Sequence, residues 1–416
     1  MKRNLVIVAM IILTFFVISF LTNIIGPLVP DIIASFDLSL TTMALLPFAF
    51  FIAYGIMSIP SGILVEKIGE KKVMVLAFLL SFIGAALFAW MPSFMMYVVS
   101  LFFIGTGMAM LQVAINPLLR VAGGEEHFAF NSVLAQLFFG LASFISPLVY
   151  TYLVVNMQEG NVNTLTNLLS GFVPTDLAWI SLYWIFAFVS LLMVLIIGLS
   201  KLPSVVLRED EKVGALDTHV SLLKKPMVML YFFGIFAYVG SEQGVANWIS
   251  QFLQTYHDVD PQTQGASTVA YFWGMMTTGT VLGLVLLKFV DSRKVLIGFT
   301  VASMLSLFLA LTGTKSMALI GFPFVGFFIS VMWSIIISLA LNSVASHHGS
   351  LSGILVTAIS GGAIIPLIVG SLGDRFGLKF GMYFIFLTLA YILSIGFWSK
   401  PLINNEIIGS KKIETQ

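Results

Sequence analysis

The chain has 416 residues, of which 59% are hydrophobic and only 9% are charged. Soluble proteins carry about a quarter charged residues, so this composition excludes an ordinary soluble fold. The net charge of +1 gives no support to a nucleic-acid partner, and the absence of cysteine excludes disulfides and cysteine metal sites. Apolar runs of about 20 residues, long enough to cross a bilayer, recur along the chain. We therefore predict an all-α polytopic membrane protein and not a β-barrel, whose strands alternate apolar and polar residues.

The N-terminal sequence MKRNLVIVAM has a basic flank, but the apolar run that follows is too long for a signal-peptide core. We interpret it as the first of twelve membrane-spanning helices. In chain order, the sequence predicts spans at 5–33, 42–65, 72–91, 95–119, 128–154, 179–200, 226–255, 264–288, 294–313, 316–343, 350–372 and 378–399.

Lysine and arginine are unevenly distributed over the connecting loops. With both termini in the cytoplasm, all but three of the 20 basic residues fall on the cytoplasmic side, the exceptions being Lys315, Arg375 and Lys379. An excess of lysine and arginine marks cytoplasmic loops. The sequence therefore predicts a multi-pass protein of the bacterial inner membrane with both termini inside.

A long mixed-charge loop divides the spans six and six. We predict an N-terminal six-helix half at 1–200, a cytoplasmic linker at 201–225 and a C-terminal six-helix half with a short cytoplasmic tail at 226–416. The two halves echo each other, because spans five and eleven both follow a polar loop of small residues, are rich in glycine, alanine and serine, and contain a proline, Pro147 or Pro366. Pseudo-symmetric halves are typical of transporters whose site lies between two repeats. The sequence assigns no role to the second long loop, at 156–176.

Span seven contains an acidic residue, Glu242, near its middle. A carboxylate at bilayer depth costs several kcal/mol, roughly 2.5–3.5 on insertion scales, and persists where a partner or a function compensates it. Two interpretations remain open: Glu242 joins helices through hydrogen bonds, or it belongs to a cation or solute site.

Amide side chains recur at helical spacing on four spans. Span seven has a stripe that we expect to be continuous, from Gln243 through Asn247 and Gln251 to Gln254. Amides donate and accept hydrogen bonds, so several facing stripes suit a polyhydroxy ligand, although a single amide is equally explained by an interhelical bond. Tryptophans could stack on a sugar ring or simply anchor at the interface. The candidate substrate-binding residues are Asn23, Gln112, Asn116, Gln136, Gln243, Asn247, Trp273 and Trp333.

The short charged turn between spans two and three contains Gly62, Glu66, Lys67 and Gly69. It is either a positive-inside determinant or a gate latch that clasps neighbouring helix ends in one state. The sequence has no phosphate loop and no metal-ligand spacing, and its five histidines fall in loops or at span ends. An ATP-driven pump, an enzyme or a metal protein therefore has little support, and the expected cofactors are none beyond a coupling proton or sodium ion.

Four stretches of sequence resemble known transporters. The turn from Gly62 to Lys72 is similar to the G-x-x-x-D-R-x-G-R-[KR] signature of the major facilitator superfamily, with Glu66 and Lys67 in the acidic and basic places. Within that superfamily the chain resembles the fucose–galactose–glucose cation symporters. The stretches that carry this resemblance are QVAINP at 112–117, YVGSE at 238–242 and GGAIIP at 361–366, with a weaker match at 271–274.

The resemblance implies a transporter of twelve helices, usually monomeric, but this chain departs from the family at charged positions. Members have an acidic residue in span one where this chain has Gly26, the fucose permease has an acid where this chain has Gln112, and many members have an arginine where this chain has Thr280. By the predicted spans, Glu242 is then the only acidic residue deep in the membrane.

Together these features predict uptake of a monosaccharide or small sugar derivative by alternating access, with Glu242 as the cation-coupling residue and with sugar and lipid bilayer as the partners. One alternative is a facilitator or symporter of another neutral solute, such as a cell-wall amino sugar. A non-transporting solute sensor is the other, although the tail after Pro401 is too short for a signalling domain. The sequence leaves open the solute, the coupling ion and the oligomeric state.

Overall fold

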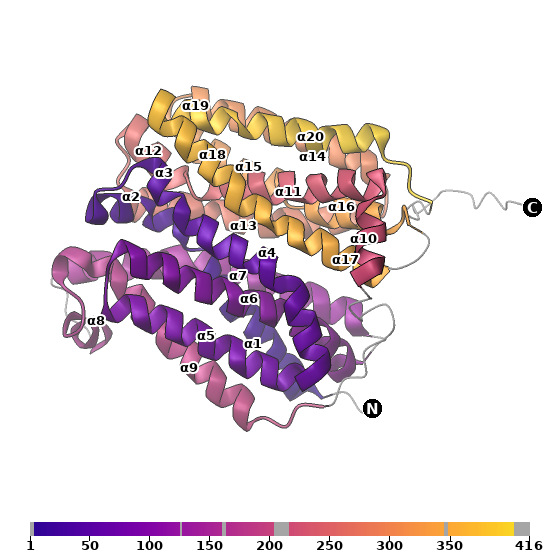
Figure 1. The fold of residues 1–416 in the computed structure, drawn as a ribbon. Helices are drawn as coiled ribbons and strands as arrows, with labels where there is room; N and C mark the ends of the chain where they lie inside the picture. The colour runs from indigo at the N-terminus through magenta and orange to yellow at the C-terminus, as the bar shows by residue number, and fades with distance from the viewer. Residues whose placement is uncertain (1–3, 125–126, 160–163, 204–215, 345–347, 403–416) are drawn as a thin grey trace, which may run out of the picture.

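The computed structural model describes residues 4–124, 127–159, 164–203, 216–344 and 348–402, and these residues form a bundle of helices without strands (Figure 1). The first half of the chain lies beside the second half. The helices are α1 (Leu5–Thr22), α2 (Ile25–Phe36), α3 (Leu40–Met43), α4 (Leu45–Ile68), α5 (Glu70–Trp90), α6 (Phe94–Gly123), α7 (Phe128–Gln158), α8 (Thr164–Ser170), η2 (Thr175–Ile180), α9 (Ser181–Leu199), α10 (Leu216–Leu223), α11 (Pro226–Ala246), α12 (Ile249–His257), η3 (Pro261–Gly265), α13 (Ala266–Leu286), α14 (Ser292–Thr312), α15 (Lys315–Ile329), α16 (Met332–Leu341), α17 (His348–Thr357), η4 (Ala358–Ser360), α18 (Gly361–Phe376), α19 (Leu378–Tyr383) and α20 (Ile385–Trp398).

Eleven helical stretches among the described residues are long and apolar enough to cross a membrane. The pair α11 and α12 falls outside this set, because its acidic and amide side chains lower its mean hydropathy, yet it lies among the other spans of its half (Figure 1). Counting this pair as a span gives a number consistent with the twelve that the sequence predicts. The prediction of an all-α polytopic membrane protein is confirmed.

Three of the spans are broken near their middles. Span one breaks at Asn23 and Ile24, where Pro27 lacks the N–H that would bond to the Asn23 carbonyl group. Span seven breaks at Asn247 and Trp248, and span ten breaks at Ser330 and Val331. Freed backbone groups are tolerated at membrane depth only where protein or a water-filled cavity can satisfy them. The breaks therefore indicate where these helices face the interior of the bundle.

In each half of the chain, a glycine brings one pair of helices into close contact, and the two pairs occupy corresponding places in the two halves. A Cβ atom added at Gly105 in α6 would lie 2.3 Å from the Phe50 carbonyl oxygen in α4, and one added at Gly326 in α15 would lie 2.3 Å from the Phe272 carbonyl oxygen in α13. Helices in lipid associate through such close backbone approach. Spans two and four, and spans eight and ten, thus cross in the same way.

At one end of the bundle, α2, α3, α12 and α19 lie close together (left in Figure 1). We call it the outer end, following the predicted orientation. Here the Asp374 carboxylate of α18 accepts hydrogen bonds from the backbone N–H groups of Leu40, at 2.8 Å, and Thr41, at 2.9 Å. The Gln262 side chain donates to Asp31 at 3.0 Å. Because each of these bonds joins the first half of the chain to the second, the structure is closed at its outer end.

At the opposite end, a similar contact is found in each half. Lys71 donates to the Ser200 carbonyl oxygen at 2.8 Å, and Arg293 donates to the Ser399 carbonyl oxygen at 3.4 Å. Burial alone would raise the pKa of Asp291, the N-cap of α14. Hydrogen bonds and the positive charge from Arg293, together with a hydrogen bond from the backbone N–H group of Lys294, hold that pKa below its usual range. The predicted linker is described at 201–203 and in α10, which contacts α17; residues 204–215 lie outside the described part of the chain.

Candidate functional site

Glu242 lies in the last third of α11, half-buried, and both of its carboxylate oxygens accept hydrogen bonds. The Tyr238 hydroxyl group donates to Oε2 at 2.6 Å, and the Gln243 amide donates to Oε1 at 3.0 Å. The Tyr238 ring lies 6.0 Å from the Trp333 ring of α16, measured between centroids. These four residues, which we call the Glu242 cluster, bring together three sequence candidates and one residue, Tyr238, from the family motif YVGSE.

The amide stripe predicted on span seven is not continuous, and this expectation was wrong. Asn247 is the C-cap of α11, and Trp248, with φ −105° and ψ −4°, is the N-cap of α12, so the regular helix is interrupted at these two residues. The stripe is therefore divided between two helices, with Gln243 in α11 and Gln251 in α12. The break also leaves the Asn247 Nδ2 and Trp248 Nε1 atoms buried without a hydrogen-bond partner among the described residues.

Three of the predicted site residues have a buried polar atom without a partner in the described part of the chain. These atoms are Gln112 Oε1 in α6, Asn247 Nδ2 after α11 and Trp273 Nε1 in α13. An unmade hydrogen bond at a buried atom costs about 1–3 kcal/mol. Water or a hydroxylated ligand would satisfy all three, since they include both an acceptor and donors. The Gln112 side chain also lies next to the Tyr54 hydroxyl group of α4.

Asn23, by contrast, is used in helix packing. Its amide donates to Ser143 of α7 at 2.8 Å, and Ser19 and Ser143 share a hydrogen bond at 2.6 Å. In this conformation, a hydrogen bond between helices is therefore enough to explain the presence of Asn23. Asn116 and Gln136 are exposed, and Asn116 donates only weakly to the Gln112 carbonyl oxygen of its own helix, at 3.4 Å. Among the described residues we find no hydrogen bond or ring contact that joins them to the Glu242 cluster.

Gly26 explains why an acidic side chain has no room at this place in span one. A Cβ atom added here would lie 2.2 Å from the Ala246 carbonyl oxygen, at the point where α2 crosses the end of α11. The contact joins the two halves of the chain close to the Glu242 cluster. The missing family carboxylate is thus replaced by direct backbone packing.

The charged turn between spans two and three lies at the inner end of α4. Gly62 is buried, Glu66 and Lys67 are exposed, and Gly69 has a φ of +84°, which favours glycine. Beside this turn, Lys71 donates a hydrogen bond to the Ser200 carbonyl oxygen of the same half of the chain. Its role as a gate stays a prediction.

A second acidic residue, Asp31, lies inside predicted span 5–33, but near its outer end and not deep in the membrane, so that Glu242 as the only deep acid stays a prediction. Asp31 of α2 is half-buried and accepts hydrogen bonds from the Tyr150 hydroxyl group, at 2.6 Å, and from Gln262, at 3.0 Å. It lies inside span 5–33, and its place directly after Pro30 could have drawn attention to it. The resemblance to the family draws attention to Gly26, five positions earlier, and not to Asp31.

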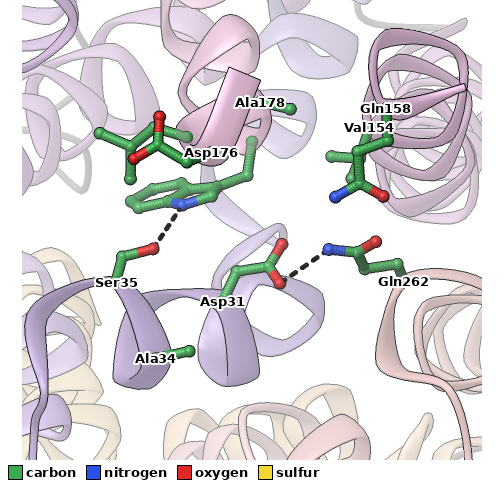
Figure 2. Close-up of a pocket in the computed structure, with 10 residues that line it drawn as sticks. Asp31, Ala34, Ser35, Val154, Gln158, Asp176, Ala178 and Gln262 are labelled. Carbon is green, nitrogen blue, oxygen red and sulfur yellow. Dashed lines mark hydrogen bonds between the residues drawn. The ribbon is translucent and has the colours of Figure 1, made fainter. Parts of the chain in front are cut away.

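Asp31 borders a cavity of about 330 Å³ at the outer end (Figure 2). Figure 2 shows Asp31 and Ser35 on α2 facing Asp176 and Gln158, with Gln262 beside Asp31 and hydrogen-bonded to it. The Trp179 indole donates to Ser35 at 3.0 Å. None of the residues that line the cavity belongs to the Glu242 cluster, so the two sites are separate.

Comparison with known proteins places the chain among transporters. The model of the Major Facilitator Superfamily matches residues 11–366. A glucose/galactose transporter of Brucella abortus biovar 1 (strain 9-941) is 32% identical over 394 residues, which are 92% of each chain. The L-fucose-proton symporter of Escherichia coli K12 is 26% identical over 378 residues, covering 87% of this chain and 86% of that protein.

Solved structures show the same fold. The fucose:proton symporter of E. coli matches with a TM-score of 0.67 at 22% identity, over 94% of this chain and 98% of that chain. A bacterial homologue of the human lysosomal transporter Spinster, inward-facing and occupied, matches with a TM-score of 0.77 at 15% identity, over 96% and 97%.

A helical membrane bundle with broken spans and polar side chains in its interior is the architecture of a secondary transporter. The chain belongs to the major facilitator superfamily, and its curated relatives include sugar transporters and sugar symporters. The resemblance inferred from the sequence motifs is confirmed.

Proposed function

We propose that this protein takes up a monosaccharide, or a small sugar derivative, across the inner membrane by alternating access, and that Glu242 couples this uptake to a cation. The Glu242 cluster carries the proposal: a carboxylate in the membrane, held by two hydrogen-bond donors, beside an aromatic pair. The names of the relatives support a sugar as the solute. The buried unpaired atoms of Gln112, Asn247 and Trp273 offer the mixture of donors and acceptors that sugar hydroxyl groups require.

The geometry favours a proton over sodium as the coupling ion. Both groups that contact the Glu242 carboxylate are donors, a hydroxyl group and an amide N–H. A bound metal cation would need oxygen atoms to face it and these donors to turn away. Protonation needs only the Tyr238 hydroxyl hydrogen to turn, because the neutral acid can then donate to the Tyr238 oxygen while it still accepts from Gln243.

The test is the Glu242→Gln variant in proteoliposomes with an imposed proton gradient. Glutamine keeps the size of the side chain but cannot carry the proton, so uphill accumulation of labelled sugar should be lost while sugar counterflow persists. Asp258→Asn, an exposed acid at the end of α12, serves as the control and should accumulate sugar as the unmodified protein does. Uphill uptake by Glu242→Gln would refute coupling through this residue.

A second candidate is an uncoupled facilitator of a neutral solute, such as a cell-wall amino sugar. The observation that favours it is Gly26, where backbone packing occupies the place of a family carboxylate. Uptake across a panel of labelled sugars, with and without a protonophore, separates the two. A facilitator equilibrates its solute and is indifferent to the protonophore, whereas a symporter loses accumulation.

A further inference from the structure

The turn between spans eleven and twelve repeats the spacing of the charged turn between spans two and three. The cytoplasmic turn has Gly62, then an acid and a base at Glu66 and Lys67, and a second glycine at Gly69. In the outer turn, Gly370, Asp374, Arg375 and Gly377 follow at the same intervals. A lysine lies two residues after the second glycine in both turns.

The two turns also share their backbone geometry. Gly69 has φ +84° and ψ 158°, and Gly377 has φ +90° and ψ 147°. Each glycine ends one helix and begins the next. The N–H group of Gly69 bonds to the Val65 carbonyl oxygen at 2.9 Å, and that of Gly377 bonds to the Gly373 carbonyl oxygen at 2.8 Å. The two segments are therefore the same structural device, at opposite ends of the bundle.

The outer copy joins the two halves of the chain through hydrogen bonds to Asp374. Asp374 accepts from the backbone N–H groups of Leu40 and Thr41, at 2.8 and 2.9 Å, and from the Thr41 hydroxyl group at 2.5 Å. Hydrogen bonds to a charged acceptor are the strong ones, worth about twice a neutral bond. All three donors belong to the first half of the chain and the acceptor to the second.

The glycines of the outer turn allow this approach. A Cβ atom at Gly370 would lie 2.6 Å from the Leu40 carbonyl oxygen, and one at Gly373 would lie 2.8 Å from the Leu40 side chain. The end of α18 is thus shaped to receive the beginning of span two. If the Asp374 carboxylate only capped its own helix, the close approach of Leu40 to Gly370 and Gly373 would not be needed.

We propose that Asp374 is a gating residue, which holds the outer end closed in the conformation described here and releases the start of span two when the transporter opens outward. This inference rests on the proposed alternating-access transport. It assigns to the outer turn the latch function that the sequence suggests for its cytoplasmic counterpart. Opening must break three hydrogen bonds to one carboxylate, so the loss of its charge shifts the balance of states toward the open one.

The experiment measures the opening directly. The chain has no cysteine, so spin labels can be attached at two introduced cysteines without a background. Leu45→Cys and Phe376→Cys are suitable, since both side chains are exposed and lie beside the latch on opposite halves. Distances between the labels are recorded in detergent and in lipid without solute, and the label pair alone serves as the reference.

Added to this pair, Asp374→Asn should raise the ratio of the long-distance to the short-distance population about tenfold, which corresponds to ~1.4 kcal/mol. Thr41→Val removes one of the three bonds and should give a smaller shift, and Thr41→Ser should restore the original ratio. Asp258→Asn, an exposed outer acid at which the left-handed backbone tolerates asparagine, should change nothing.

An unchanged distance distribution in Asp374→Asn and in Thr41→Val would overturn the proposal, as would an equal shift in Asp258→Asn. If Asp374→Asn does not fold, the two Thr41 variants decide alone. Because the distances need no solute or gradient, failure of the latch is distinguishable from failure of the proposed transport, which Glu242→Gln tests separately.

Discussion

Asp31 is an ionisable residue to which the sequence assigns no role, and the structure shows it in contact with both halves of the chain. Its carboxylate links three segments, because Tyr150 donates to it from α7 and Gln262 donates to it from η3. Thr151, the neighbour of Tyr150, in turn donates to the Gln262 carbonyl oxygen at 2.7 Å. Asp31 is therefore the centre of a second connection between the halves at the outer end, beside the Asp374 latch.

We predict that Asp31→Asn weakens outer closure. Asparagine can still accept a hydrogen bond, but it loses the charge, and the difference of about 1 kcal/mol between charged and neutral bonds gives roughly a fivefold shift. The reporter is Val154→Cys, a buried residue that lines the outer cavity and should react faster with an impermeant maleimide when the end opens.

Asp176→Asn is the matched control for this prediction. Asp176 lines the same cavity, but among the described residues we find no hydrogen bond from it to the second half of the chain. Its variant should leave the labelling rate of Val154→Cys unchanged. Equal rates in Asp31→Asn and in the unmodified background would show that the Asp31 connection does not contribute to closure.

At the scale of the elements, the crossing of α2 and α11 is a close backbone contact between the two halves near the Glu242 cluster. Gly26 faces a backbone carbonyl group, which cannot turn aside as a side chain can. We predict that Gly26→Ala is disfavoured in the closed conformation and increases the long-distance population of the Leu45 and Phe376 label pair. It should also lower the Tm, because the backbones must separate.

Gly298→Ala provides the control for this crossing. Gly298 lies inside α14, and an added Cβ atom there meets no atom within 4 Å. Alanine is the better helix former, so this variant should be neutral or slightly stabilising. Equal behaviour of the two variants would mean that the close contact at Gly26 has no influence on the balance of states.

Hydropathy and motifs in the sequence sufficed to predict the helices, but not where they break. The predicted stripe on span seven assumed one helix, whereas the structure breaks at Trp248, a residue with no proline or glycine beside it to signal a break. Span one has such a signal in Pro27. The breaks at Asn247 and Ser330 have no proline within the next four residues, so a pattern within one span does not indicate them.

The candidate site was predictable in part for the same reason. The motif YVGSE pointed to Glu242. Tyr238 and Glu242 are one helical turn apart, and this spacing allows the hydrogen bond between them. The use of Asn23 to bind Ser143 could not be predicted, because the partner lies 120 positions away. Both interpretations of an amide in a membrane helix, packing and ligand binding, are realised in this molecule at different residues.

For the whole molecule, the direction of insertion in the membrane determines which end of the bundle faces outward. The distribution of lysine and arginine predicts that the turn between α5 and α6 is outside and that the C-terminal end of α20 is inside. Both places have exposed side chains, Met91 at the first and Leu402 at the second. Because the protein has no cysteine of its own, each can be examined with a single introduced cysteine.

We predict that Met91→Cys reacts with an impermeant maleimide in right-side-out vesicles and Leu402→Cys only in inverted vesicles. Neither substitution alters a charge, so the signal that sets orientation is preserved. Permeabilised vesicles, in which both cysteines should react, control for accessibility. The opposite pattern would show that the protein is inserted in the reverse orientation. The Asp374 latch and the Asp31 cavity would then face the cytoplasm, and the same hydrogen bonds would close the inner entrance.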